Sequence, residues 1–130
     1  TRAIIASPND ASLIGTRGSL LLAQDRVFDA LVDLEKAVTL APDNALLLVN
    51  RSQAYRKFNR YQEAMADLDK AVALSPELVP ARFNRAVTNN ALGDQAGAVS
   101  DMNKFIELSD NPEWKKVAQD TLAAWQKESN

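Results

Sequence analysis

The sequence predicts an all-α fold, a solenoid of helix-turn-helix repeats closed by a C-terminal capping helix. Three observations support this prediction. The chain repeats itself every 34 residues, each repeat contains two amphipathic segments separated by a short break, and no stretch alternates apolar and polar residues for long enough to form a strand. A repeat of this length is one pair of helices, and such pairs bury their apolar faces by stacking on one another.

The repeat divides the 130 residues into consecutive units. Residues 11–44 align with 45–78 without gaps, and 12 of the 34 aligned positions are identical. One further step gives a third repeat at 79–112. Residues 1–10 resemble the end of a repeat, so we expect them to be the last part of a truncated preceding repeat. The remaining segment, 113–127, is expected to form the capping helix, and the whole chain one domain.

Each repeat is expected to break once, between its two helices. The three breaks fall at Asp25-Arg26, Asn59-Arg60 and Gly93-Asp94, because Gly, Asn and Asp favour the backbone conformations found at helix ends. Pro42 and Pro76 follow the second helices of the first two repeats. Proline lacks an amide N–H and its ring clashes within a helix, so we expect both helices to end before these residues.

The last helix carries the features of a cap. Asn111 is expected to be its N-cap residue, with Pro112 in the first turn. An apolar stripe runs from Trp114 to Trp125, and charged and amide residues occupy the other face. We expect both tryptophans to pack on the third repeat; the alternative is a partner site that uses a tryptophan.

The residues that recur at fixed positions resemble those of the tetratricopeptide repeat (TPR). The third repeat departs from the family pattern, because Arg82 and Asn89 stand at apolar and aromatic positions, which bears on how tightly its first helix packs. The resemblance implies a right-handed TPR-type α-solenoid whose first helices line a concave groove, and a role in protein–protein interaction. In the second repeat the matching residues are Leu48, Arg51, Ser52, Tyr55, Ala64, Leu68 and Pro76.

The composition argues against catalysis. The chain has no cysteine and no histidine, which removes thiolate nucleophiles, imidazole bases and the usual zinc and copper ligands. Asp33 and Glu35 recur as Asp67 and Asp69 only because the repeat recurs, and residues two apart on a helix do not face each other. We therefore expect no enzymatic activity, no cofactor and no metal site.

Charge and hydropathy narrow the classes of partner. Lys and Arg number 15 and Asp and Glu 17, a net charge of -2, whereas a nucleic-acid-binding protein normally carries a basic excess. No apolar run approaches the ~20 residues of a membrane-spanning helix. We therefore expect neither a nucleic-acid partner nor membrane insertion. The sequence does not indicate a cellular localisation.

Three arginines recur with three aspartates. Each arginine precedes an aspartate by 16 residues, which places the two on the first and second helices of one pair. We expect them to form structural ion pairs that set the register of the helices rather than add much stability. The alternative is an anion site for a partner. The residues are Arg17, Arg51, Arg85, Asp33, Asp67 and Asp101.

The resemblance implies that exposed residues of the first helices form a peptide-binding groove. Asn50 and Asn84 lie one repeat apart and can bond the backbone of a peptide of any sequence, because an amide side chain both donates and accepts. Val49 and Phe83 are expected to supply apolar contact beside them, and Arg56 with Lys57 to favour an acidic group. The expected groove residues are Thr16, Val49, Asn50, Gln53, Arg56, Lys57, Phe83, Asn84, Val87 and Asn90.

Two functions fit this pattern. The first is a protein–protein interaction scaffold that binds a peptide or partner segment in the concave groove. The second is a structural or assembly module that self-associates through an open N-terminal edge around Ile4 and Ile5, since truncated solenoids expose apolar surface there. Chaperone-binding TPR domains use a clamp of basic residues, but Gly15, Pro80 and Asn84 stand at the matching positions, so we expect no strong preference for a chaperone tail.

Overall fold

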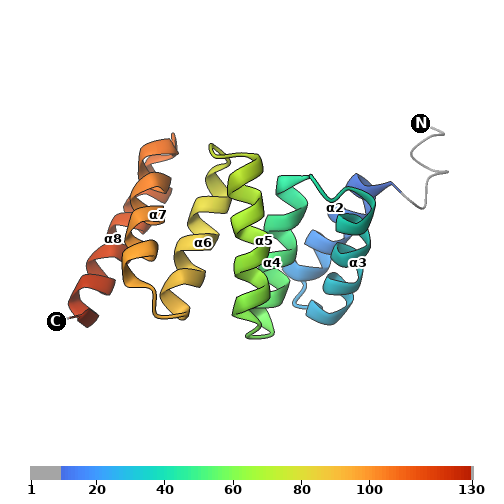
Figure 1. The fold of residues 1–130 in the computed structure, drawn as a ribbon, viewed down its shortest axis with the longest axis horizontal. Coiled ribbons are helices and arrows are strands. Elements are labelled where there is room, and N and C mark those ends of the chain that lie inside the picture. Colours follow the sequence, from blue (N-terminus) through green and yellow to red (C-terminus); the bar gives the residue numbers. More distant parts are fainter. Residues whose placement is uncertain (1–9, 130) are drawn as a thin grey trace.

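In the computed structural model, which describes residues 10–129, seven α-helices form a short solenoid (Figure 1). No strand occurs in this part of the chain, so the predicted all-α solenoid is confirmed. The segment predicted to end a preceding repeat, including Ile4 and Ile5, lies outside the described residues except for Asp10. The helices are α2 (Ala11–Ala23), α3 (Val27–Leu40), α4 (Ala45–Lys57), α5 (Tyr61–Leu74), α6 (Val79–Ala91), α7 (Gln95–Leu108) and α8 (Pro112–Ser129).

The helices pack as successive pairs along one axis. The pairs are α2 with α3, α4 with α5 and α6 with α7, and neighbouring pairs meet through α3 with α4 and α5 with α6. Figure 1 shows the first pair at one end of the solenoid and α8 at the other. The first helices also contact one another, α2 with α4 and α4 with α6, so they share one face. None of the described helices is both long and apolar enough to cross a membrane.

Local chemistry sets the helix ends. Asp10 caps α2 by accepting from the backbone N–H groups of Ser12 (2.9 Å) and Leu13 (3.2 Å), and Asn44 and Asp94 cap α4 and α7 in the same way. Asp25, Asn59 and Gly93, 34 residues apart, have positive φ angles of 63°, 61° and 88°. This left-handed conformation ends a helix, so the three predicted breaks are confirmed.

The two helices of a pair approach closely because small residues stand where they cross. Ala30, Ala64 and Ala98 are fully buried at equivalent positions of α3, α5 and α7. On α2, a Cβ added to Gly18 would lie 2.7 Å from Leu34 Cγ, closer than van der Waals contact allows. The crossing in the first pair therefore depends on a residue without a side chain.

Helix α8 closes the C-terminal end of the solenoid. Asn111 caps it by accepting from the backbone N–H groups of Glu113 (2.9 Å) and Trp114 (3.1 Å), as predicted. Ala118 and Trp125 join the core of the third pair, and Trp125 is only 6% exposed. Trp114 also packs on the third repeat, edge-on against Phe83 with ring centroids 6.2 Å apart, but it stays 52% exposed because it lies in the first turn of α8.

Candidate functional site

The structure brings each recurring arginine to the aspartate 16 residues later. Arg51 donates to both carboxylate oxygens of Asp67, from Nε at 2.8 Å and from Nη2 at 2.6 Å. The Arg17–Asp33 and Arg85–Asp101 pairs have the same two-bonded geometry. The hydrogen bonds that Arg51 donates to Asp67 raise the pKa of Arg51, against the lowering effect of burial.

These pairs tie the first helix of each pair to the second. All three carboxylates are buried, with 3–7% of each aspartate exposed, and each receives two N–H donors from its arginine. In each pair the negative charge of the aspartate neutralises the arginine, and two of the guanidinium N–H groups are already bonded to it. Each arginine therefore attracts an anion of a partner less strongly than an unpaired arginine would. The geometry therefore favours the structural reading of the six residues over the anion-site alternative.

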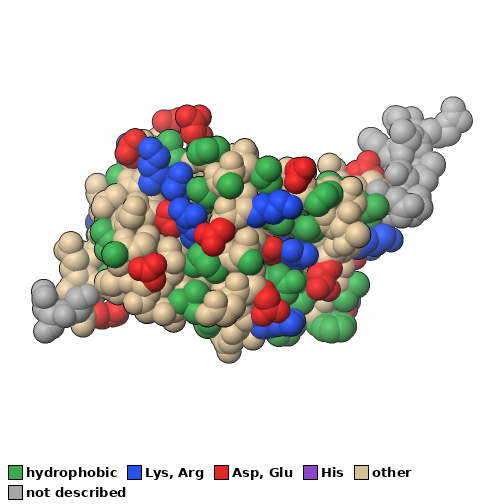
Figure 2. Space-filling model, viewed as in Figure 1, with side chains coloured by type: hydrophobic (Ala, Val, Ile, Leu, Met, Phe, Trp, Pro, Cys, Tyr) green, Lys and Arg blue, Asp and Glu red, His purple; other side chains and the backbone are tan. Residues whose placement is uncertain are grey.

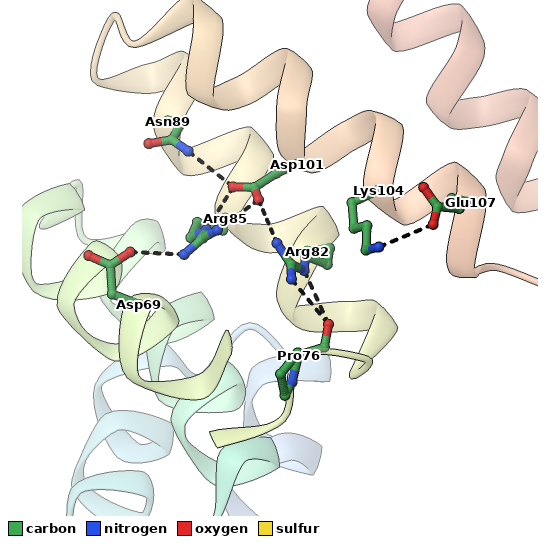
Figure 3. Close-up of polar contacts among 8 residues, drawn as sticks. All are labelled: Asp69, Pro76, Arg82, Arg85, Asn89, Asp101, Lys104 and Glu107. Atoms are coloured by element: carbon green, nitrogen blue, oxygen red, sulfur yellow. Dashed lines mark hydrogen bonds and ion pairs between the residues drawn. The ribbon is translucent and has the colours of Figure 1, made fainter. Parts of the chain in front are cut away.

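The third pair extends this arrangement into a network (Figure 3). Arg82 donates to the backbone oxygen of Pro76 at 3.2 Å and to Asp101 at 3.3 Å, and Asn89 donates to Asp101 at 3.2 Å. Arg85 also reaches Asp69 of the preceding repeat at 3.2 Å. The two polar residues that depart from the family pattern thus hold the first helix of this repeat in place by hydrogen bonds.

The expected groove residues differ in their accessibility. Lys57 forms an exposed ion pair with Asp25 at 3.7 Å. Asn50 donates to Ser19 Oγ at 3.0 Å, which links α4 to α2 across the shared face. Thr16 and Lys57 are exposed, Asn50, Gln53, Arg56, Phe83, Val87 and Asn90 are half-buried, and Val49 and Asn84 are buried.

Two of these expectations need correction. Val49 is only 1% exposed and packs in a core cluster with Leu48 and Ala81, because α4 turns this side towards the neighbouring pair. It is therefore not available for apolar contact with a peptide. Asn84 is 5% exposed, donates to the Pro80 oxygen at 2.8 Å and accepts from Arg56 at 2.9 Å, so its amide is already engaged within the protein.

A cavity of about 650 Å³ opens where α4, α6 and the turn between α7 and α8 meet. Four predicted groove residues line it, Gln53, Arg56, Phe83 and Asn84. The other lining residues come from outside the predicted set. They are Val79, Pro80, Phe105, Leu108, Ser109, Asp110, Asn111 and Trp114. Val79 and Pro80 begin α6, and the rest belong to α7, α8 and the turn between them, from which the prediction drew no residue.

Aromatic side chains form one wall of this cavity. The Phe83 and Phe105 ring centroids lie 5.1 Å apart with an interplanar angle of 56°. Phe83 also meets the Trp114 ring edge-on, with centroids 6.2 Å apart. The signal in the sequence that bears on this wall is the apolar stripe beginning at Trp114, which predicts packing on the third repeat or, as the alternative, a partner site that uses a tryptophan.

Arg56 distinguishes the cavity electrostatically. Every other arginine between residues 10 and 129 is paired with an Asp or Glu carboxylate. Arg56 instead makes one hydrogen bond, from Nη1 to Asn84 Oδ1, and no described carboxylate lies within ion-pair distance. Burial lowers the pKa of Arg56, since a desolvated cation is costly, yet a guanidinium stays charged. The cavity thus presents a cation that forms no ion pair with the described residues, although the Asp110 carboxylate also lines the cavity.

The fold and the cavity define a class of protein, a helical-repeat solenoid with a solvent-open site on the face of its first helices. The family model of the tetratricopeptide repeat matches residues 45–78. The second repeat of the chain is therefore a tetratricopeptide repeat, the solenoid has the TPR-type fold, and this fold is typically a non-catalytic module for protein interaction. No curated protein sequence is significantly similar to the chain.

Several solved TPR domains share the architecture. The first TPR domain of Spaghetti (RPAP3), bound to the HSP90 peptide SRMEEVD, is 25% identical, with 92% of each chain covered and a TM-score of 0.82. The second TPR domain of the same protein, bound to the same peptide, is 26% identical, with 76% of this chain and 86% of that chain covered and a TM-score of 0.73. The Arabidopsis OM64 TPR domain is 22% identical, with 88% and 94% covered and a TM-score of 0.79.

Proposed function

We propose that this chain is an interaction scaffold that binds an extended or helical segment of a partner protein on the face shared by α2, α4 and α6. The observation that carries the proposal is the convergence of four predicted groove residues on one open cavity of about 650 Å³. A volume of this size suits one or two residues of a bound chain. Two similar TPR domains hold a peptide, which supports the same kind of role here.

Two amide side chains of α4, Asn50 and Gln53, supply the expected contacts to the peptide backbone. Asn50 uses one N–H to reach Ser19 and keeps its carbonyl oxygen without a hydrogen bond to the described residues. Gln53 is half-buried and lines the cavity, and its side-chain amide makes no hydrogen bond with the described residues. Asn84, by contrast, orients Arg56. We therefore assign backbone contact to Asn50 and Gln53 rather than to the pair Asn50 and Asn84.

We also propose that the partner is not a chaperone tail held by its terminal carboxylate. Of the positions where a basic clamp is expected, Gly15 is buried against Leu47 and Pro80 cannot carry a charge. Asn84 is neutral and already bonded within the protein. An HSP90-type peptide with a free C-terminus should therefore bind no better than its amidated form, measured by isothermal titration calorimetry. A large preference for the free acid would contradict the proposal.

A selection from a peptide display library tests the proposed groove. The groove variant is Asn50→Ala/Gln53→Ala, and the matched control is Gln62→Ala/Asn103→Ala, which removes two exposed amides from α5 and α7. We expect peptides to enrich on the wild type and on the control but not on the groove variant, with equal thermal stability of all three. Enrichment that survives the groove variant, or no enrichment on any of them, would overturn the proposal.

A second candidate function is self-association through the N-terminal edge. Leu20 is 59% exposed, whereas Ala54 and Thr88, at the equivalent positions of α4 and α6, are fully buried by the preceding pair. Leu13 is 39% exposed, against 5% for its equivalent Leu47. In the other pairs this surface is covered by a neighbouring pair, but on α2 no described residue covers it. We propose that a second copy of the chain occupies it.

Light scattering coupled to gel filtration tests this candidate. We expect the mass to rise towards twice that of the monomer with increasing concentration, and Leu20→Glu to keep the chain monomeric at every concentration. A matched change on a polar surface, Gln126→Glu, should leave the mass unaltered. A monomeric wild type throughout would exclude self-association and leave the groove as the functional surface.

A further inference from the structure

We propose that the cavity holds a bulky apolar side chain of the partner segment, preferably an aromatic one, and that an acidic side chain next to it in the partner pairs with Arg56. This inference rests on the proposed function and specifies the chemistry of the segment that the groove binds. It is carried by two independent features of the cavity, an exposed aromatic wall and a cation that forms no ion pair with the described residues.

The aromatic wall explains the preference for a bulky apolar group. Trp114 is 52% exposed, although it stands beside Phe83 and Phe105 at the mouth of the cavity. Val79 and Leu108 add aliphatic surface to the lining. An aromatic ring entering here would extend the edge-to-face contacts that Phe83 already makes with its neighbours, and it would remove the exposed face of Trp114 from water.

The position of Arg56 explains the acidic residue. A guanidinium has five N–H donors, and the described residues engage one of them. The bond to Asn84 fixes the guanidinium at the edge of the cavity, because Asn84 is itself held by the Pro80 oxygen. A carboxylate is the group that matches the remaining donors in charge and in planar geometry.

The charges around the cavity also give the segment a direction. Asp110, in the turn before α8, also lines the cavity and forms no ion pair with Arg56 or with any other described residue. It would repel an acidic group there and so favours the orientation that brings the acid to Arg56. A side-chain carboxylate fits this arrangement better than a chain terminus, because one cation suffices for it and the basic clamp positions are neutral.

Titration with capped dipeptides tests the inference by nuclear magnetic resonance. The probes are acetyl-Phe-Glu-amide and acetyl-Glu-Phe-amide. In the comparison probes, either Gln replaces Glu or Ala replaces Phe. The reporter is the indole N–H signal of Trp114, and the buried Trp125 provides an internal control. Probe concentrations reach about 10 mM, a range that detects the weak affinity of a two-residue ligand.

We expect the Phe-Glu or Glu-Phe probe to shift the Trp114 signal saturably and to bind about fivefold more tightly than its Gln counterpart at low salt. The Ala probes should bind much more weakly. Arg56→Gln should abolish the difference between Glu and Gln probes, and Asp110→Asn should strengthen binding of the Glu probes. The matched control Arg60→Gln, which removes an exposed arginine paired with Glu63, should change none of these results.

Failure of this inference is distinguishable from failure of the proposed function. If display peptides enrich on the groove but lack an aromatic residue next to an acid, or if the dipeptides leave the Trp114 signal unmoved, the inference is overturned and the groove proposal stands. Equal binding of Glu and Gln probes overturns the part assigned to Arg56. The dipeptides can also bind as expected while the display selection is unaffected by the changes at Asn50 and Gln53. In that case the aromatic and acidic preference of the cavity stands, and the assignment of peptide-backbone contacts to Asn50 and Gln53 is refuted.

Discussion

Arg56 on α4 donates a hydrogen bond of 2.9 Å to Asn84 on α6, and this bond links the first helices of two successive repeats. Asn84 is buried, and its side-chain amide donates a hydrogen bond of 2.8 Å to the backbone oxygen of Pro80. The pair therefore joins a structural role, the spacing of α4 and α6, to a recognition role, the orientation of a cation at the mouth of the cavity.

Replacement of Asn84 should cost stability as well as affinity. Asn84→Ala leaves the cation without its acceptor in a half-buried position and creates a small void, so we expect a loss of about 1–2 kcal/mol in the free energy of unfolding. Urea denaturation measures this loss. Asn90→Ala is the control, because Asn90 lies on the same helix and its side chain makes no hydrogen bond with the described residues. It should change the free energy of unfolding by less than about 0.5 kcal/mol. Equal effects of the two changes would contradict the role of Asn84.

The Arg51–Asp67 pair should be the more strongly coupled of the first two arginine–aspartate pairs. The side chain of Arg51 is 21% exposed and that of Asp67 is 7% exposed, whereas the Arg17 side chain is 65% exposed. Water screens the exposed pair, so we expect double-mutant cycles with alanine to give about 1–2 kcal/mol of coupling for Arg51–Asp67 and a smaller value for Arg17–Asp33. A larger coupling for the Arg17 pair would refute this ranking.

Addition of one methyl group at Gly18 should destabilise the first helical pair. The new Cβ would meet Leu34 Cγ at 2.7 Å, and Leu34 is fully buried. We expect Gly18→Ala to lower the free energy of unfolding by about 1–2 kcal/mol, because overpacking outweighs the better helix propensity of alanine. Ser52→Ala, at the equivalent position of α4, is the control and should cost less. A rise in melting temperature for Gly18→Ala would show that Leu34 relaxes freely.

Alkaline pH should weaken the fold through Tyr55. Burial raises the pKa of the Tyr55 hydroxyl, an effect partly offset by the nearby Arg51 cation. Tyr55 keeps its proton in the folded chain at a pH where the unfolded chain has lost it. Its contribution is therefore complete below the unfolded pKa of about 10 and falls as pH rises through the folded value. Tyr55→Phe should flatten the decline in stability, measured by urea denaturation between about pH 9 and 11. An unchanged slope would remove Tyr55 as the cause.

Much of the site could be predicted because its residues follow from the repeat. The spacing of 16 residues within the repeat places Arg51 and Asp67 on the two helices of one pair, and their contact in space then follows from the packing of that pair. Accessibility could not be predicted in the same way. Val49 lies on the same helix as Gln53, but the neighbouring pair covers Val49 and leaves Gln53 at the cavity.

By itself, the sequence determined the helices, their breaks and the stacking of pairs, because these depend on interactions between residues close along the chain or one repeat apart. Asp25, Asn59 and Gly93 end helices wherever the repeat places them. Only the tertiary structure decided that Trp114 stays exposed beside Phe83 and that Arg56 lacks a carboxylate partner. Trp114 lies where α8 meets the third pair, and Arg56 lies where the second pair meets the third. Burial and charge pairing are properties of these junctions rather than of any one segment.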